Sequence, residues 1–301
     1  MKVSILMNGY NCEKYVAQAI ESVFSQTYIN WEIIFVDNCS TDSTASIVKS
    51  YNSDKIRFLT TEENIPLGAA RNFGLTYCDG DFLCFLDTDD IWLKDKLDLQ
   101  IQLFLRDPLL KLSYTGVRFI DGNGTEFGSY TPKAKNDDVF RRLLVRYEIN
   151  QQSVMIRNDF SFSFDSSKKY SVDFCLFMGI CAEYKAAMIP DKLVKYRMHD
   201  SNFSLEANEL EWKEGKSALD EIFKKNPSLK DKYSKEYSKA YARVYYHKAR
   251  YLMTINKLKE ARRVLKKNSK VSLFYFGLYI LALFPSYFWL SIHRQFRRFS
   301  Q

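Results

Sequence analysis

No CxxC pair occurs among the six cysteines of this 301-residue chain, so the ligand spacing of a structural zinc site is missing. The chain also lacks a basic segment followed by an apolar one before its first expected strand, which starts at Lys2. Such a segment would mark a secretory signal peptide. We therefore expect reduced cysteines in a cytosolic compartment, where disulfides are rare.

Acidic residues are nearly absent from the end of the chain. Residues 238–301 contain 14 lysines and arginines but one acid, Glu260, so this part carries a net charge of +13. The whole chain carries +8, which leaves −5 for residues 1–237. A basic tail beside apolar residues favours an anionic membrane surface as its partner, and nucleic acid is the alternative.

Charged residues are also missing from Val271–His293, unless the histidine is protonated. A run of this length is long enough for a transmembrane helix. Pro285 in its middle, its many aromatic residues and the basic residues on both sides instead favour the headgroup boundary. We predict an in-plane or re-entrant membrane anchor, with a helix packed on the protein's own core as the alternative.

The composition, 46% hydrophobic and 27% charged residues, is that of a folded globular protein. Residues 1–90 alternate between strand and helix patterns, which predicts an α/β fold with a parallel sheet and right-handed crossovers. The expected strands are Val3–Met7, Trp31–Val36, Ile56–Thr60 and Asp81–Leu86; the expected helices are Cys12–Gln26, one that begins within Ser40–Ser43 and ends near Tyr51, and Leu67–Tyr77.

Beyond these elements the pattern is more mixed. A helix at Lys94–Arg106 and a strand at Leu112–Ile120 precede a turn-rich segment, Asp121–Gly128. A further strand is expected at Asn150–Ile156, and Ala240–Leu265 resembles a helical hairpin. The chain therefore continues into a second half of different organisation.

Polar residues follow three of the expected strands: Asn8–Asn11, Asp37 and Asp87-Thr88-Asp89. Ligands bind beyond the carboxyl ends of parallel strands, so we expect these residues to share one site. Two carboxylates one residue apart suit Mg²⁺ or Mn²⁺, with phosphate oxygens as further ligands. An acidic turn that caps the next helix is the alternative, but the buried strand before the cluster favours the metal.

Two further positions belong to this expected site. Asp37 can accept hydrogen bonds from a base or a ribose, with an Asx turn into the next helix as the alternative. Asn64 and Arg71 lie on either side of the start of the third expected helix. From there Arg71 can contact phosphate or pair with an acidic residue of the cluster.

Two segments of the chain resemble the family 2 glycosyltransferases. They are residues 3–44, VSILMNGYNCEKYVAQAIESVFSQTYINWEIIFVDNCSTDST, and residues 64–97, NIPLGAARNFGLTYCDGDFLCFLDTDDIWLKDKL, which contain the DxD motif. The similarity is close over residues 3–98 and looser to about Ser204. It implies a GT-A fold, which is a Rossmann-like, mixed and mostly parallel sheet flanked by helices, here with a C-terminal helical extension.

The resemblance also implies roles for individual residues. Tyr10, Asn11 and Asp37 would line the base and ribose pocket with Arg71 close by, Asp87 would reach the ribose, and Asp89 would ligate the metal. We assign to the nucleotide sugar Tyr10, Asn11, Asp37, Asn64, Arg71, Asp87 and Thr88. One departure from the family is Asn8-Gly9 where the first strand normally runs into Pro-Thr.

The second half supplies two more candidates by resemblance. The family's catalytic base lies in an acidic pair at the start of a helix, which here is Val172-Asp173, so Asp173 is the candidate base that deprotonates the acceptor. Capping of the helix by Asp173 is the alternative, and Val172 replaces the first acid.

In Lys195-Tyr196-Arg197-Met198-His199 the histidine is expected near the metal, although a structural or surface role is the alternative.

We therefore predict an inverting glycosyltransferase that moves a sugar from a nucleotide-diphosphate sugar, with UDP expected, to a glycan or lipid-linked acceptor. Its cofactor would be Mn²⁺ or Mg²⁺. The enzyme would act in cell-surface polysaccharide or lipopolysaccharide synthesis on the cytoplasmic face of the inner membrane. Nucleic acid is not expected as a partner. A sugar nucleotidyltransferase and a non-catalytic nucleotide-sugar-binding subunit are the alternatives. Sugar nucleotidyltransferases usually have a Gly- and Arg-rich loop after the first strand, where this chain has Asn8–Asn11.

The expected domains follow from these assignments. Residues 1–204 would form the GT-A domain, with a donor-binding half at 1–110 and an acceptor half at 111–204. A helical extension at 205–270 and the membrane-associating tail at 271–301 would complete the chain. Gln151–Ser153 and the loop before Tyr170 are expected to contribute to acceptor recognition.

Overall fold

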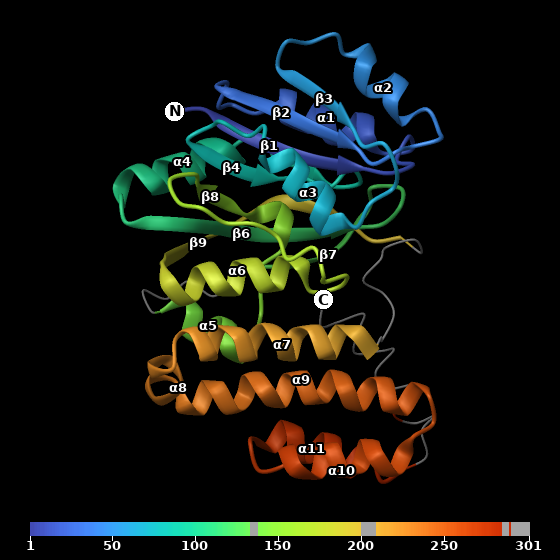
Figure 1. Ribbon diagram of the computed structural model, residues 1–301, viewed down its shortest axis with the longest axis vertical. Coiled ribbons are helices and arrows are strands. Elements are labelled where there is room, and N and C mark those ends of the chain that lie inside the picture. The colour runs from blue at the N-terminus through green and yellow to red at the C-terminus, as the bar shows by residue number, and fades with distance from the viewer. Residues whose placement is uncertain (133–137, 200–208, 285–288, 290–301) are drawn as a thin grey trace. The chain divides into compact units, whose positions relative to one another are not determined.

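The computed structural model describes residues 1–132, 138–199, 209–284 and Trp289 (Figure 1). The chain divides into two compact units. The first contains Met1–Val139 and Glu148–Asn202, and the second contains Phe140–Tyr147 and Phe203–Gln301. The division of residues 1–204 into a donor half and an acceptor half stays a prediction.

The first unit is built on one mixed sheet. In the described residues its nine strands have the order β3-β2-β1-β4-β8-β6-β9-β5, and β7 pairs with β6. One half of the sheet, from β3 to β4, is parallel, whereas β8 is antiparallel to both of its neighbours. The strands are β1 (Val3–Gly9), β2 (Trp31–Asp37), β3 (Ile56–Thr60), β4 (Phe82–Phe85), β5 (Ile91–Trp92), β6 (Leu110–Ile120), β7 (Glu126–Tyr130), β8 (Met155–Arg157) and β9 (Lys185–Arg197).

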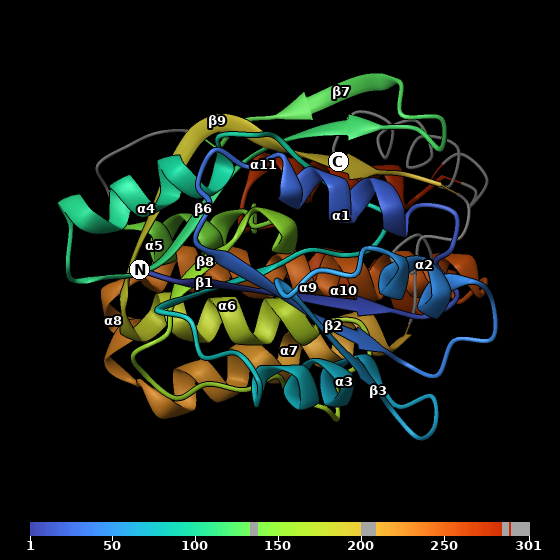
Figure 2. The same cartoon turned by 90° about the horizontal axis from the view of Figure 1, so that it is seen from above.

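Helices cover both faces of this sheet, which explains why its central strands are apolar on both sides. α1 (Val16–Phe24) and α4 (Lys96–Arg106) lie on one face, and α3 (Leu67–Leu75) and α6 (Val172–Glu183) lie on the other (Figure 2). α2 (Thr44–Ser50) contacts α1. Alternate residues of a strand point to opposite faces, so Ile5 packs in the core with α1 while Leu6 lies under α3.

Gly74 allows α3 to lie close to the sheet. A Cβ atom at this position would stand 2.3 Å from Leu6 Cδ1 and 2.8 Å from Val36 Cγ2. Any larger residue would push the helix away from β1 and β2. The position of α3 matters because this helix also carries Arg71.

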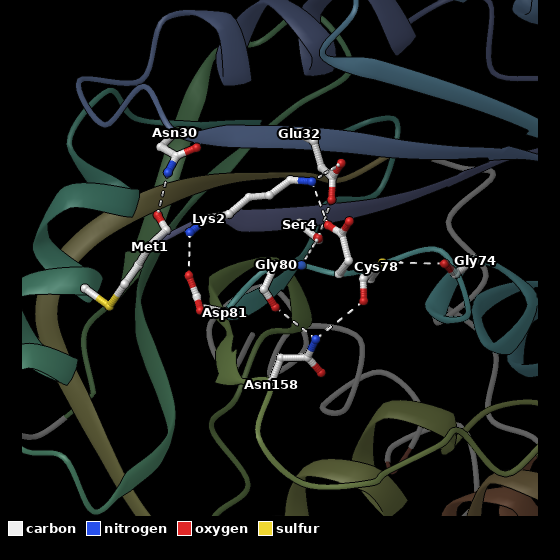
Figure 3. Close-up of polar contacts among 11 residues, drawn as sticks. Met1, Lys2, Ser4, Asn30, Glu32, Gly74, Cys78, Gly80, Asp81 and Asn158 are labelled. Atoms are coloured by element: carbon white, nitrogen blue, oxygen red, sulfur yellow. Dashed lines mark hydrogen bonds and ion pairs between the residues drawn. The ribbon is translucent and has the colours of Figure 1, made fainter.

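A group of polar contacts ties the strands together at their amino ends (Figure 3). Lys2 Nζ lies 2.7 Å from Glu32 Oε2 and 2.6 Å from Asp79 Oδ1, and the Lys2 backbone N–H donates to Asp81 Oδ2 at 2.7 Å. The Ser4 hydroxyl donates to Glu32 Oε1 at 2.6 Å. These contacts join β1, β2 and the segment before β4, and they leave the carboxyl ends of the strands for the acidic residues.

Two predicted segments differ from the structure. β7 begins at Glu126, within the segment expected to be turn-rich, because Asp121 Oδ1 accepts the N–H groups of Asn123 and Thr125 at 2.9 Å and closes the turn early. The strand expected from Asn150 begins at Met155, because a 3₁₀ turn at Gln151–Ser153 comes first. The other expected strands and helices are confirmed to within a few residues at their ends.

The second unit is helical. Its elements are most of α5 (Val139–Val145), α7 (Glu209–Lys225), α8 (Ser228–Lys232), α9 (Ser234–Thr254), α10 (Leu258–Asn268) and α11 (Leu273–Leu281). The predicted helical hairpin is confirmed, since α9 and α10 pack against each other. Ala249, Leu252 and Met253 of α9 share an apolar core with residues of α10 and α11.

The predicted membrane anchor is described only in part. α11 and Trp289 fall within it, whereas residues 285–288 and 290–301 lie outside the described residues. None of the helices in the described ranges has the length and apolar character needed to cross a membrane. The in-plane anchor stays a prediction.

Candidate active site

The acidic cluster lies in a short loop after β4. The Leu86 N–H still donates to Leu6 O of β1 at 3.1 Å, and the chain then turns, with the Asp90 N–H 3.3 Å from Asp87 O. The loop contains Asp87, Thr88, Asp89 and a fourth polar residue, Asp90, before β5 begins. It therefore occupies the carboxyl edge of the sheet, as predicted.

Asp87 is held on both sides of its carboxylate. Arg71 Nη2 lies 3.3 Å from Oδ1, and Gln152 Nε2 donates to Oδ2 at 2.5 Å. Gln152 Oε1 also accepts the Asp87 backbone N–H at 2.7 Å. Arg71 and Gln152 are buried, whereas the Asp87 side chain is 38% exposed. The carboxylate therefore has a defined orientation while it stays open to a ligand.

Gln152 reaches Asp87 because of the 3₁₀ turn before β8. The Asn150 side chain accepts the Gln152 N–H at 3.1 Å, and the Gln152 carbonyl accepts from Trp92 Nε1 at 2.9 Å. These two bonds fix the backbone on either side of the Gln152 side chain. The expected contribution of residues 151–153 to acceptor recognition stays a prediction, and the structure adds the contact of Gln152 with Asp87.

Arg197, at the end of β9, supports the other half of the loop. Its backbone N–H donates to Asp90 Oδ1 at 2.7 Å, and its Nε donates to the Asp89 carbonyl at 2.8 Å. The remaining guanidinium nitrogens donate to Gln18 Oε1 at 2.8 Å and to the carbonyls of Asp121 and Gly122 at 3.2 and 3.3 Å. Arg197 is buried, and this one side chain connects α1 and the turn after β6 to the acidic loop.

Asp90 differs in character from its acidic neighbours because it is almost completely buried. Burial, together with the charges of Asp89 and Asp87, raises the pKa of Asp90 well above its ordinary value, against the hydrogen bond from Arg197. Its Oδ1 accepts the Arg197 N–H, so Asp90 joins the loop to β9. A role in shaping the loop explains this geometry better than contact with a ligand.

Asp89 and His199 form the second open part of the site. His199 Nε2 lies 3.0 Å from Asp89 Oδ2, and the two side chains are 20% and 28% exposed, respectively. Burial and the neighbouring charge of Asp87 raise the pKa of Asp89, whereas its hydrogen bond with His199 lowers it. The His199 ring lies 5.6 Å from the ring of Tyr15, whose hydroxyl donates to Gly122 O at 3.1 Å.

The loops after β1 and β2 are joined to each other beside this cluster. Asn11, which has a positive φ of 49°, donates from its N–H to the Ser40 hydroxyl at 3.0 Å. Its side-chain oxygen accepts the Thr41 N–H at 2.8 Å. Tyr10 precedes it with 53% of its surface exposed. Asn11 therefore holds the turn, and Tyr10 is the residue that is open to a ligand.

Asp37 and Asn64 lie on the same side of the site, at the end of β2 and before α3. Asp37 is buried, and its Oδ1 lies 3.3 Å from the Ser40 N–H, a contact typical of the Asx turn that is the alternative to ligand binding. Its contact with a base or ribose stays a prediction. Asn64 is exposed and donates from Nδ2 to the Asn38 carbonyl at 3.0 Å. Asn38 in turn accepts the Ile65 N–H at 3.0 Å, so it joins the loops that carry Asp37 and Asn64.

Cys12 connects the two sides of the site. Its N–H donates to the Thr44 hydroxyl at 2.8 Å, and its thiol also makes a hydrogen bond with Thr88 of the acidic loop. Burial raises the pKa of the thiol, against the hydrogen bonds that the thiol itself makes with Thr88 and Thr44. Thr88 is itself buried, so its side chain packs inward between Asp87 and Asp89 and is not open to a ligand.

Asp173 lies in the first turn of α6, where a carboxylate was expected. Burial raises its pKa, the positive charge of Arg71 lowers it, and the negative charge of Asp87 raises it further. The Asp173 carboxyl is therefore within electrostatic range of the same arginine that holds Asp87. Val172, which stands in place of the family's first acid, is a buried core residue.

The structure thus brings most of the predicted residues to one edge of the sheet, and it shows three residues whose contacts with the acidic loop the sequence does not predict. Gln152, Arg197 and Asp90 all hold the acidic loop. Arg197 stands two positions before the predicted His199, and this proximity was the one available signal. Gln152 has no distinctive pattern around it that would have singled it out.

The donor atoms of the site fit a divalent cation. Asp89 Oδ2 and His199 Nε2 lie close enough to share an ion, and carboxylate and imidazole suit Mn²⁺. Across the described ranges, no three histidine, cysteine, aspartate or glutamate side chains form a complete protein site. A cation bound here would therefore need further ligands from a diphosphate or from water.

Comparison with known proteins identifies the family of this chain. Residues 4–170 match the sequence profile of "Glycosyl transferase family 2". The UDP-Glc:alpha-D-GlcNAc-diphosphoundecaprenol beta-1,3-glucosyltransferase WfgD of Escherichia coli is 32% identical over 208 residues, which cover 67% of this chain and 79% of that enzyme.

Solved structures show the same fold. S. aureus TarS 1–349 has a TM-score of 0.67 at 21% identity, over 90% of this chain and 81% of that one, and TarS has also been solved with UDP-GlcNAc. A mannosyltransferase from Pyrobaculum calidifontis, in complex with GDP-Man and Mn2+, has a TM-score of 0.61 at 16% identity, over 99% of this chain and 85% of that one. The predicted GT-A fold is confirmed. With the profile match over more than half of the chain and the likeness to WfgD, this protein belongs to glycosyl transferase family 2 and is a glycosyltransferase.

Proposed function

We propose that the enzyme transfers a sugar from a UDP-sugar to an acceptor hydroxyl with inversion at the anomeric carbon. The observation that carries this proposal is the pair of open carboxylates at one sheet edge. Asp87 is oriented by Arg71 and Gln152, and Asp89 lies beside His199. A nucleotide diphosphate needs both a hydrogen-bonding partner for its ribose and positive charge near its phosphates.

In the proposed donor complex, Asp87 accepts hydrogen bonds from the ribose, and Tyr10 covers the base beside Asp37. Asn11 shapes the turn that presents Tyr10, Asn64 contributes from the opposite loop, and Thr88 sets the spacing between the two carboxylates. UDP as the nucleotide is supported by the UDP-GlcNAc complex of TarS and by the UDP-Glc in the name of WfgD.

Asp89 and His199 would hold Mn²⁺ or Mg²⁺ against the diphosphate. Such an ion neutralises the charge that develops on the departing diphosphate. The Mn2+ in the mannosyltransferase complex of the same fold supports this assignment. The chain's own part is to place a carboxylate and an imidazole 3.0 Å apart at the edge where the phosphates would lie.

Asp173 would act as the general base. Its carboxylate takes the proton of the acceptor hydroxyl as the oxygen attacks the anomeric carbon from the side opposite the diphosphate. That geometry inverts the anomeric configuration. Its position near Arg71 and Asp87, together with its location in the first turn of α6, supports this role.

We further propose a lipid-linked or glycan acceptor in cell-surface polysaccharide synthesis, with the enzyme attached to the cytoplasmic face of the membrane. The diphosphoundecaprenol acceptor in the name of WfgD and the basic, apolar C-terminal tail support this part.

The test is a screen of nucleotide sugars for Mn²⁺-dependent release of the nucleoside diphosphate. Asp89→Ala and His199→Ala should each lower the rate by at least about 100-fold, because each removes a metal-binding group. Asp54→Asn, on an exposed acid away from the site, should leave it unchanged. Full activity of Asp89→Ala would disprove the metal assignment, and release of pyrophosphate in place of nucleoside diphosphate would disprove sugar transfer.

A further inference from the structure

α10 has two chemically distinct faces. Leu258, Ala261 and Leu265 pack into the core of the second unit. On the opposite side lie exposed cations at the spacing of one helix face: Lys259, Arg263, Lys266 and Lys267, continued by Lys270 beyond the helix end. The acid of this helix, Glu260, lies 3.9 Å from Lys257. A strip of net positive charge therefore follows the outer side of α10.

α11 also has two faces, but both are apolar. Leu278 and Ala282 are buried in the same core as Ala261 and Leu265. The other side exposes Leu273 (89%), Phe276 (50%) and Ile280 (40%), and Leu283 (49%) follows the helix at the same spacing. Surface helices normally carry polar residues on the side away from the core, so this exposed apolar face needs a partner.

The two helices are held in a fixed relation to each other. Arg262 of α10 donates from Nε to the Ala282 carbonyl at 2.7 Å and from Nη2 to the Leu283 carbonyl at 3.2 Å. The shared core supplies the apolar contacts between them. The cationic strip and the apolar side therefore lie on two helices that are fixed to each other. We call the two together the α10–α11 face and define it as Lys259, Arg263, Lys266, Lys267, Lys270, Leu273, Phe276, Ile280 and Leu283.

We propose that the α10–α11 face docks on an anionic lipid bilayer, with α11 in the interface plane. Phe276 and Ile280 would enter the boundary of the acyl chains, while the lysines and arginine of α10 would meet lipid phosphates. Stable attachment to a membrane surface normally needs two such signals, buried apolar area and a basic patch, and this face contains both.

Charge decides between a bilayer and other partners. In a twofold contact between two copies, each cationic strip would approach its own symmetry mate, and like charges would oppose association. Nucleic acid would neutralise the strip but would leave the apolar face in water. A bilayer with anionic headgroups would neutralise the cationic strip and also bury the apolar side of α11.

The test measures how the full-length protein partitions onto vesicles of equimolar phosphatidylglycerol and phosphatidylcholine, and onto vesicles of phosphatidylcholine alone. Strong, salt-sensitive binding is expected only with the anionic lipid. The double variants Phe276→Asp/Ile280→Asp and Arg263→Glu/Lys267→Glu should each weaken binding at least about tenfold, because they remove the apolar and the electrostatic contribution, respectively.

Matched controls carry the same charge changes elsewhere. Leu105→Asp/Leu109→Asp and Lys94→Glu/Arg106→Glu alter exposed residues of the first unit and should bind like the original protein. The proposal is overturned if Phe276→Asp/Ile280→Asp binds undiminished, or if the original protein binds neutral and anionic vesicles equally. It is also overturned if the protein forms a dimer or binds RNA through this face without binding vesicles.

This proposal rests on the membrane attachment proposed above, for which it names the docking residues, and it is tested separately from the transfer reaction. Nucleotide-sugar hydrolysis in the absence of vesicles should be the same in the α10–α11 variants as in the original protein. Loss of docking with intact hydrolysis supports the docking face, whatever the identity of the donor.

Discussion

The backbone N–H of Arg197 lies 2.7 Å from Oδ1 of Asp90, the last residue of the acidic loop, and both residues are buried. The Arg197 side chain adds a hydrogen bond to the carbonyl of Asp89, the proposed metal ligand. Asp89 is thus held through its backbone by a residue 108 positions later in the chain.

Arg197→Lys should raise the Mn²⁺ concentration that the enzyme needs for activity, with a smaller effect on its free energy of unfolding. Lysine keeps the charge but cannot reproduce a planar group that bonds to several acceptors at once. We expect the Mn²⁺ concentration for half-maximal hydrolysis to rise about tenfold, from the loss of roughly 1.5 kcal/mol of positioning. Arg157→Lys is the control, because Arg157 donates to the carbonyls of Leu110 and Phe104 elsewhere in the unit. Equal Mn²⁺ requirements in both variants would refute the positioning of Asp89 by Arg197.

Gln152→Glu should impair donor binding. The substitution keeps the size of the side chain but places a carboxylate where an amide N–H now donates to Asp87 Oδ2. Loss of a hydrogen bond to a charged group, with repulsion added, should raise the KM for the nucleotide sugar at least about tenfold. The same change at the exposed Gln102 of α4 serves as control. An unaltered KM would mean that Asp87 needs no orientation by Gln152.

The pH dependence of the transfer rate should report the ionisation of Asp173, the proposed general base. Burial raises the pKa of Asp173, and a general base works only when deprotonated. The kcat/KM should therefore fall as the pH is lowered through an apparent pKa above the ordinary value of 3.8. Asp173→Asn should abolish transfer while nucleotide-sugar binding, measured by calorimetry, persists. Transfer that survives in this variant would exclude Asp173 as the base.

Lys96 should make a contribution to the stability of the first unit that increases as the pH is raised. This buried lysine donates to Gln100 Oε1 at 2.8 Å, and burial lowers its pKa from 10.5 to about 8. The unfolded chain therefore binds more protons than the folded one between pH 8 and 10.5, so the contribution of Lys96 to stability rises with pH across this window.

Comparison with Lys96→Met isolates this contribution. The free energy of unfolding of the original protein should gain about 3 kcal/mol relative to the variant between pH 7 and pH 10.5. Chemical denaturation at several pH values measures the difference. A constant gap between the two proteins would show that Lys96 keeps an ordinary pKa in the folded state.

Local pattern determined much of the fold. The apolar runs of β1 and β2 and the stripe Val16, Ala19, Ile20 and Val23 of α1 are recognisable without any long-range contact. Parallel strands end at one edge of a sheet, so the sequence alone predicts that Asp37 and Asp87 lie at the same edge. The sequence by itself therefore determined the alternation of strands and helices, the sheet edge that carries the site and the DxD loop.

Only the tertiary structure decided how that loop is held. Gln152 comes 65 positions after Asp87, and Arg197 comes 107 positions after Asp90. Glutamine and arginine are common polar residues, and no local periodicity reveals which of them will be buried against a carboxylate. The β8 and β9 pairings place them there, because β8 pairs with β4 and β9 pairs with β5, which brings late segments of the chain beside the acidic loop. Side-chain hydrogen bonds across such distances depend on the closed sheet, and local residue pattern does not predict them.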